Sequence, residues 1–140
     1  MPTASVVSIQ ALRKTVHHLE QGARYEWGHM GRCNAGHLVQ TLTGMSAVEI
    51  VKTAHHQLDE WTEHANDYCQ GTGENVSDLF QTLEKAGFSA ADIVHLENLS
   101  DQRVLQQLPA EKRYLKRNQV NDVCLYMRTL ADLLEDDLAA

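Results

Sequence analysis

Residues 119–136, QVNDVCLYMRTLADLLED, carry the clearest helical pattern in the sequence. Apolar side chains recur there at steps of three and four residues, the spacing that gathers them on one face of an α-helix. The stripe consists of Val120, Val123, Met127, Leu130 and Leu134. The pattern predicts an amphipathic helix that buries this stripe. Cys124 lies at its edge, where we expect a packed, inert thiol.

The same spacing continues through the segments before this helix. Further helices are predicted over 8–21, 32–43, about 47–62, from Asn75 or Ser77 to Gly87, from about 90, at 101–107 and at 110–116. Ser46 and Glu49 form a capping box, and Ser89 caps the helix at about 90. No segment shows the alternation of a strand. We therefore predict an all-α fold: a single compact irregular bundle of five to seven helices, with residues 1–140 as a single helical domain.

The composition excludes several classes of protein. The chain has 140 residues, 43% of them hydrophobic, and a net charge of −7. This charge argues against a nucleic-acid or anionic-membrane partner. The sequence begins without a signal-peptide pattern, has no apolar run of membrane-spanning length, and carries three widely spaced cysteines. We therefore expect a soluble, cytoplasmic protein in a reducing compartment.

One short segment departs from the acidic average. Lys112, Arg113, Lys116 and Arg117 surround Tyr114. Such a basic face could hold a phosphate. The favoured interpretation is the solvated side of a short helix whose cations pair with nearby carboxylates.

Metal-ligating and nucleophilic residues gather in the first half of the chain. Seven of the eight histidines, two of the three cysteines and both tryptophans lie there. The stretch 25–37 also contains Gly28, Gly31 and Gly36, which indicate a tight backbone close to these side chains. We therefore predict a functional pocket built from residues 25–37 and 61–71.

The first hypothesis for this pocket is a metal site. In a helix over 32–43, Cys33 and His37 lie one turn apart on the side opposite the apolar stripe. His64 and Cys69 would supply the other half of a tetrahedral Cys₂His₂ centre. Sulfur and imidazole ligands favour zinc or another transition metal, although neither half has a close cysteine pair.

A second hypothesis uses the same residues as a reactive thiol. Cys33 near a helix start would be the nucleophile, His37 or His29 the base, and Asn34 or Asn66 the residue that orients the base. A reversible disulfide between Cys33 and Cys69 is a variant of this hypothesis. The alternative is that both cysteines are small buried residues with a structural role only.

A third hypothesis is a carboxylate–histidine metal centre. Glu26 with His29, and Asp92 with His95, have the three-residue spacing that bundle di-iron sites use. No further glutamate is singled out as the ligand from another helix. This hypothesis is the weakest of the three.

A different class of function is a non-enzymatic interaction or regulatory module. Leu125 lies on the back of the last helix, and Tyr126 and Leu133 lie on its flank, where a partner helix could cover them. This pattern predicts a homodimer that self-associates through the C-terminal helix. The sequence leaves open whether the protein is an enzyme.

Overall fold

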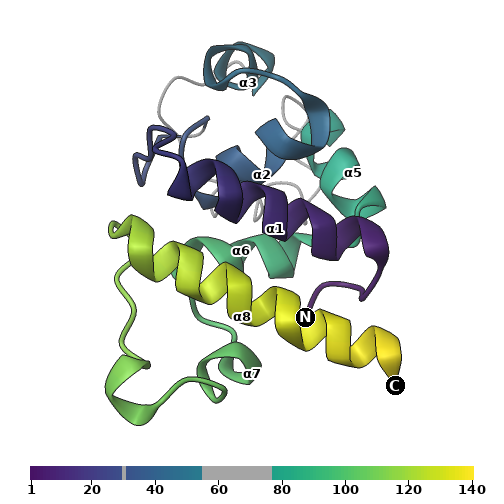
Figure 1. Ribbon diagram of the computed structural model, residues 1–140. Coiled ribbons are helices and arrows are strands. Elements are labelled where there is room, and N and C mark those ends of the chain that lie inside the picture. The colour runs from purple at the N-terminus through teal and green to yellow at the C-terminus, as the bar shows by residue number, and fades with distance from the viewer. Residues whose placement is uncertain (30, 55–76) are drawn as a thin grey trace.

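The computed structural model describes residues 1–29, 31–54 and 77–140. Within these residues there are seven α-helices and no strand, which confirms the all-α fold and the irregular bundle (Figure 1). The helices are α1 (Val6–Glu20), α2 (Asn34–Thr43), α3 (Ala47–Ala54), α5 (Ser77–Lys85), α6 (Ala90–Asn98), α7 (Gln102–Leu105) and α8 (Val120–Ala139). A 3-10 helix, η2, spans Ala110–Lys112.

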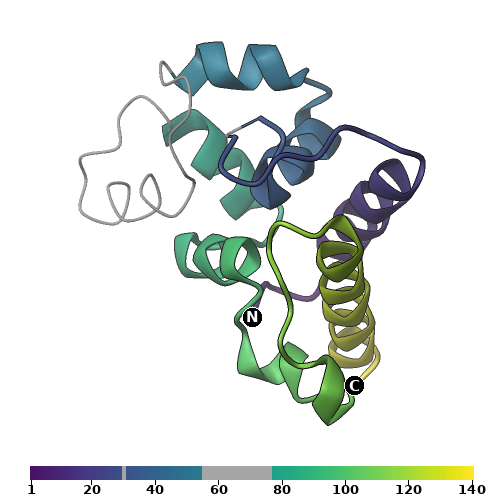
Figure 2. The same cartoon turned by 90° about the vertical axis from the view of Figure 1, so that its left-hand side faces the viewer.

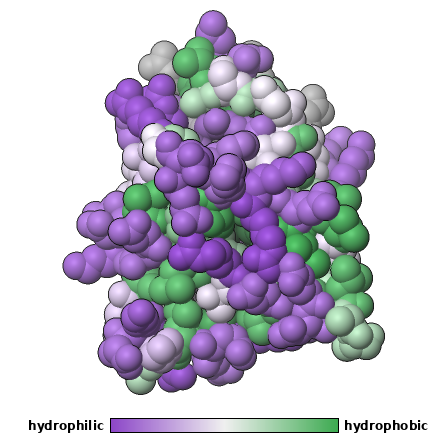
Figure 3. Space-filling model, viewed as in Figure 1, coloured by the Kyte–Doolittle hydropathy of each residue, from purple (hydrophilic) through white to green (hydrophobic). Residues whose placement is uncertain are grey.

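The two longest helices, α1 and α8, pack side by side (Figures 1 and 2). The stripe predicted for the last helix is buried at Val123, Met127, Leu130 and Leu134, and Cys124 is buried beside it. On the outer side of the pair, Arg13 reaches from α1 to two α8 carboxylates. Figure 3 shows that hydrophilic side chains cover much of the face formed by these helices, with apolar patches between them.

Helix α2 occupies the middle of the molecule, because it contacts α1, α3, α5 and α6. Its position matters for function, since it begins directly after Cys33. It ends at Gly44, whose positive φ of 74° is the left-handed conformation that favours glycine at a helix end. The element that carries the predicted site residues is therefore an inner helix, packed against several neighbours.

The predicted helix starts at Ser46 and Ser89 are confirmed. Ser46 Oγ accepts from the Glu49 backbone N–H at 3.1 Å, and a Glu49 carboxylate oxygen accepts in return from the Ser46 N–H at 3.3 Å. Ser89 and Asp92 make the same reciprocal pair at the start of α6. Each capping box satisfies backbone donors that have no partner within the helix.

Two predicted helices differ in extent. The prediction over 47–62 agrees with α3 as far as Ala54, and its remainder lies outside the described residues. The helix predicted at 110–116 is only the single 3-10 turn η2. Beyond that turn, the Arg113 side chain binds the carbonyl oxygens of Leu108 and Gln106 at 2.9 and 3.3 Å. These contacts fold the segment back on the preceding loop.

The flank of α8 is more deeply buried than the sequence pattern predicts. Tyr126 is only 1% exposed, and Leu133 is buried as well. Helix α7 packs on α8, and the Tyr126 hydroxyl accepts from the Asp101 backbone N–H at the α7 N-cap, at 3.1 Å. Only Leu125 of the three residues predicted to meet a partner is partly exposed.

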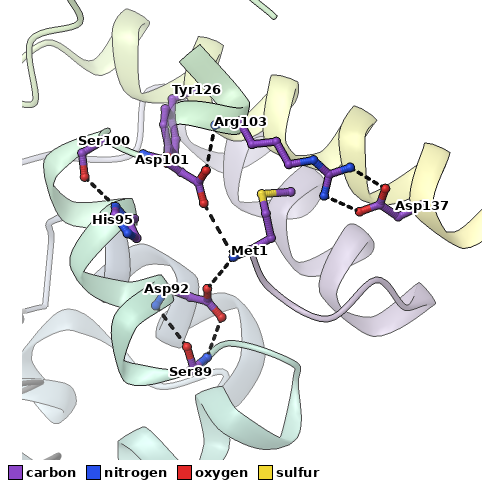
Figure 4. Close-up of polar contacts among 9 residues, drawn as sticks. All are labelled: Met1, Ser89, Asp92, His95, Ser100, Asp101, Arg103, Tyr126 and Asp137. Atoms are coloured by element: carbon purple, nitrogen blue, oxygen red, sulfur yellow. Dashed lines mark hydrogen bonds and ion pairs between the residues drawn. The ribbon is translucent and has the colours of Figure 1, made fainter. Parts of the chain in front are cut away.

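A polar cluster joins the first residue to α6 and α7 (Figure 4). The Met1 ammonium lies 3.2 Å from an Asp92 carboxylate oxygen and 3.6 Å from one of Asp101. The other Asp92 oxygen accepts from the Ser89 N–H in the α6 capping box. The cluster is therefore a set of structural ion pairs and caps. None of the helices described here has both the length and the apolar character of a membrane-spanning segment.

Candidate functional site

The side chain of Cys33 lies in a buried polar cluster at the start of α2. Cys33 is the N-cap residue and is 2% exposed. Glu97, from α6, is also buried, and one of its carboxylate oxygens accepts from the Ala35 backbone N–H at 2.7 Å and from the Cys33 thiol at 3.2 Å. A carboxylate at a helix N-terminus is favoured by the helix dipole. Glu97 therefore provides the cap that joins α6 to α2.

This environment keeps the thiol of Cys33 protonated. Burial raises its pKa well above the ordinary value, and the nearby charge of Glu97 raises it further. The sequence pattern predicts the opposite effect, a thiolate favoured by the helix start on the solvent side of α2. The difference arises because α6 covers that side of the helix and places a carboxylate there. The thiolate is the nucleophilic form of cysteine, so this surrounding opposes the reactive-thiol chemistry.

Asn34 is fully buried and joins three segments of the chain. Its amide Nδ2 donates to the Leu96 carbonyl oxygen at 2.7 Å, and its Oδ1 accepts from the Tyr25 hydroxyl. The Arg117 carbonyl oxygen lies 2.5 Å from the same hydroxyl, whose single proton is shared between the two acceptors. Burial raises the pKa of Tyr25, which keeps this hydroxyl protonated. The amide of Asn34 therefore binds α6 and the loop at Tyr25, and its contacts are structural.

His37 is buried on a different part of α2. Its Nε2 donates to the Arg24 carbonyl oxygen at 2.8 Å, and its ring stacks on that of Tyr25 with centroids 6.2 Å apart. Burial lowers the pKa of His37, so the ring is neutral at pH 7. Cys33 is directed towards Glu97 and His37 towards Arg24. The structure thus gives the predicted nucleophile and its predicted base separate partners.

The predicted Cys₂His₂ site is only half within the described residues. His64 and Cys69, and with them the whole stretch 61–71, lie outside. Across residues 1–29, 31–54 and 77–140, no group of three or more His, Cys, Asp or Glu side chains is arranged to hold a metal ion. The four-ligand centre, with zinc or another transition metal, stays a prediction.

The carboxylate–histidine pairs make other contacts. The Glu26 carboxylate lies 2.5 Å from Arg24 and 3.7 Å from Arg32. His29 Nδ1 accepts from the Gly31 backbone N–H at 3.1 Å. On α6, His95 Nδ1 is bonded to the Ser100 hydroxyl at 2.9 Å. Each of these side chains serves a local turn or ion pair.

The tight backbone predicted for 25–37 has a packing reason. A Cβ placed on Gly31 would lie 2.4 Å from the Ala47 carbonyl oxygen, so the residue must be glycine for this loop to approach α3. Gly28 has a positive φ of 87°, which side-chain-bearing residues rarely adopt. Gly31 therefore allows the loop to approach α3, and Gly28 allows a left-handed turn in the loop.

An open cleft lies on the outer side of this loop, at a place that the sequence pattern does not predict. The Arg117 guanidinium carbon lies 4.0 Å from the centroid of the Trp27 ring, and Nη1 donates to Asn98 Oδ1 at 2.5 Å. The cleft has a volume of about 430 Å³ and is lined by Trp27, Asn98, Leu115, Lys116, Arg117 and Asn118. We call it the Trp27 cleft. Its walls come from regions about ninety positions apart, so no local motif could reveal it.

A second open cleft lies on the other side of Leu115, against α8. Its volume is about 380 Å³. Its lining residues are Glu111, Lys112, Tyr114, Leu115, Asn121, Asp122, Leu125 and Arg128. Tyr114 is 91% exposed, the highest exposure among the large hydrophobic side chains of the described residues. We call this second site the Tyr114 cleft.

The basic side chains of segment 112–117 around these clefts form no ion pairs with the described carboxylates. Arg113 and Arg117 contact carbonyl and amide oxygens. Within residues 1–29, 31–54 and 77–140, no carboxylate forms an ion pair with Lys112, Arg113, Lys116 or Arg117. This differs from the favoured interpretation, in which a helix brings these cations beside acids. The segment is not helical beyond Lys112. The Arg113 and Arg117 side chains bind neutral oxygens, and the Lys116 backbone N–H donates to an Asp122 carboxylate oxygen at 2.9 Å.

Comparison of the chain with protein-family models, with curated proteins and with solved structures finds no match.

Proposed function

We propose that the protein is a non-enzymatic interaction module that forms a two-fold homodimer through the Tyr114 cleft and the adjoining flank of α8. The observation that carries this proposal is the exposed apolar group at that cleft. Tyr114 is almost fully exposed beside Leu115 and Leu125, which are partly exposed. Tyrosine is enriched in protein interfaces, where its ring is buried and its hydroxyl finds a polar partner.

The buried cluster at the start of α2 supports a non-enzymatic role. Cys33, Asn34 and His37 each contact a buried structural group, and the thiol and imidazole are held in their neutral forms. A catalytic group needs access to a substrate and a pKa suited to its task. The three residues predicted to be catalytic have neither property in this arrangement.

The charge along α8 favours a second copy as the partner. The cations of segment 112–117 precede Leu125, and the acids Asp132, Glu135 and Asp136 follow it. Asp132 and Glu135 share Arg13, so this end of the helix stays acidic. In a two-fold dimer with Leu125 near the axis, two antiparallel α8 helices bring the basic start of one beside the acidic end of the other.

The proposed interface is narrower than the one predicted from sequence. Tyr126 and Leu133 are buried within the chain, at 1% and 8% exposure, and contribute little to the outer surface. Tyr114 and Leu115 take their place beside Leu125. The interface then combines a small apolar centre with a charged rim, as is common for interfaces between stable subunits.

Sedimentation equilibrium across a concentration series tests this proposal. We expect a dimer with a dissociation constant on the order of 10 µM or below, weakened about tenfold by Tyr114→Ser or Leu125→Ser. Val48→Ser is the matched control, because Val48 is an exposed apolar residue on α3, away from the interface. A wild-type chain that remains monomeric at roughly 500 µM would refute the proposal.

A charge exchange tests the orientation of the two copies. Lys112→Glu alone is expected to weaken the dimer, because it places a negative charge opposite the acidic end of the partner helix. Adding Asp136→Lys to the same chain should restore association. If the double variant is as weak as the single one, the antiparallel arrangement is wrong.

A further inference from the structure

We propose that the Trp27 cleft binds a small organic oxyanion, a phosphate or carboxylate group carried on an apolar or aromatic body. This inference concerns a second cleft, which shares only Leu115 with the proposed dimer interface, and it does not depend on the dimer. It rests on three properties of the cleft: its charge, the ordered position of Arg117, and the apolar surface of Trp27 and Leu115.

The lining of the cleft has cations but no acid. Its six residues include Lys116 and Arg117, the amides of Asn98 and Asn118, and no carboxylate. The Tyr114 cleft is different, since Glu111 and Asp122 lie among its cations. In a chain of net charge −7, a hollow with two cations and no acid in its wall is a local exception. The field inside it therefore favours an anion.

The guanidinium of Arg117 is held in place before any ligand arrives. Its central carbon Cζ lies over the Trp27 ring, and Nη1 donates to Asn98 Oδ1. Its backbone carbonyl accepts from Tyr25, whose hydroxyl is also bonded to the buried Asn34. A side chain that is already ordered loses less conformational entropy on binding.

Arg117 keeps hydrogen-bond donors for a ligand. A guanidinium has five N–H donors, and the contact with Asn98 Oδ1 is made through Nη1. No described carboxylate pairs with it. The fork of donors matches two oxygens of a carboxylate or phosphate, and the adjacent Lys116 ammonium adds a second positive charge.

The rest of the wall indicates what carries the anion. Trp27 and Leu115 supply apolar surface, and the two asparagine amides can donate to or accept from further polar groups. A volume of about 430 Å³ lies within the usual range for small-molecule sites. The cleft therefore fits an anion joined to one ring or a short apolar chain.

Tryptophan fluorescence tests the proposal directly. In a Trp61→Phe chain, Trp27 is the only tryptophan. The probes are phenyl phosphate and benzoate, which share a ring and differ in the anion, with benzyl alcohol as the neutral control. We expect a saturable change in Trp27 emission with at least one anion and none with the alcohol. The probe that binds with the higher affinity shows whether the cleft prefers a phosphate or a carboxylate.

Substitutions in the cleft show whether the change comes from this site. Arg117→Gln should weaken binding about tenfold, Lys116→Gln by less, and Arg117→Lys should restore part of the loss. Lys52→Gln, an exposed lysine on α3, should leave the affinity unchanged. Calorimetric titration of the unsubstituted chain repeats the measurement without the Trp61 change.

Two outcomes would overturn the inference. One is the absence of saturable binding of either anion to the unsubstituted chain up to roughly 10 mM. The other is equal affinity in the wild type and Arg117→Gln. Failure of the dimer is separable from both, because Tyr114→Ser should weaken association about tenfold and leave anion binding intact.

Discussion

The cluster around Cys33 and the segment around Arg117 differ in how far their reactive and charged side chains are buried. At the start of α2, a thiol, an amide and a carboxylate are buried and bonded to one another or to backbone groups. Before α8, four cations lie at the surface and those with observed partners contact neutral oxygens. Tyr25 touches both regions, through Asn34 and the Arg117 carbonyl. Burial, and not residue type, determines which of these side chains are structural and which can contact a ligand or partner.

The largest expected difference between the two regions is in access to reagents. With Cys69→Ser and Cys124→Ala, Cys33 is the only cysteine. We expect iodoacetamide to modify it about a thousandfold more slowly in the native chain than in denaturant, because reaction requires the core to open. Mass spectrometry over time measures the rate.

An exposed thiol provides the control for that experiment. Val48→Cys, in a chain that lacks the three native cysteines, should react at nearly the rate of a free thiol, since Val48 is 53% exposed. If native Cys33 reacts as fast as this control, the buried cluster opens readily and the reactive-thiol hypothesis regains support.

Removal of the carboxylate that binds Cys33 is the next largest effect. Glu97→Ala leaves the buried Ala35 N–H and the Cys33 thiol without this acceptor. We expect the free energy of unfolding to fall by about 3 kcal/mol, measured by urea denaturation. Glu97→Gln keeps a carbonyl oxygen and should lose less. Glu84→Ala, at an exposed position on α5, should change the free energy of unfolding by less than about 0.5 kcal/mol. A loss as large as that of Glu97→Ala would show that the buried cluster contributes no more to stability than an exposed glutamate.

A moderate effect is expected from pH. The pKa of His37 is lowered below its ordinary value of 6.5 by burial, so the unfolded chain binds this proton more readily than the folded one. Stability should therefore be full above about pH 6.5 and fall as the pH drops from there towards the folded pKa. Urea midpoints at about pH 7.5 and pH 5.5 should differ less in His37→Gln than in the wild type.

An exposed histidine separates this effect from the general acid sensitivity of the chain. His17, on the outer side of α1, is exposed. His17→Gln should retain the full pH dependence of the wild type. A loss of pH dependence in this variant would assign the effect to surface charge.

The smallest effect on stability is expected in the basic segment. Lys112→Gln or Lys116→Gln removes an exposed ammonium group that forms no ion pair with a described carboxylate. The free energy of unfolding should therefore change by less than about 0.5 kcal/mol. Thermal denaturation checks this. A decrease in the free energy of unfolding of more than about 1 kcal/mol would show that these lysines stabilise the fold, which would contradict their assignment to a partner-binding surface.

The candidate site was only partly predictable. The residues of 25–37 do form a tight, bonded loop and helix start, as the glycines at 28 and 31 predict. The chemistry assigned to Cys33 and His37 depended on a solvent-facing side of α2, and α6 and the Arg24 carbonyl occupy the two positions instead. Helical periodicity marks an apolar face, but it cannot tell whether the opposite face meets water or another helix.

The sequence by itself determined the helices, their caps and the buried stripe of α8, because these depend on backbone hydrogen bonds and side-chain spacing within a few residues. Only the tertiary structure decided that Cys33 meets Glu97 and that Arg117 lies over Trp27. Those partners lie far apart in the chain, and their meeting follows from how all the helices pack together around one core.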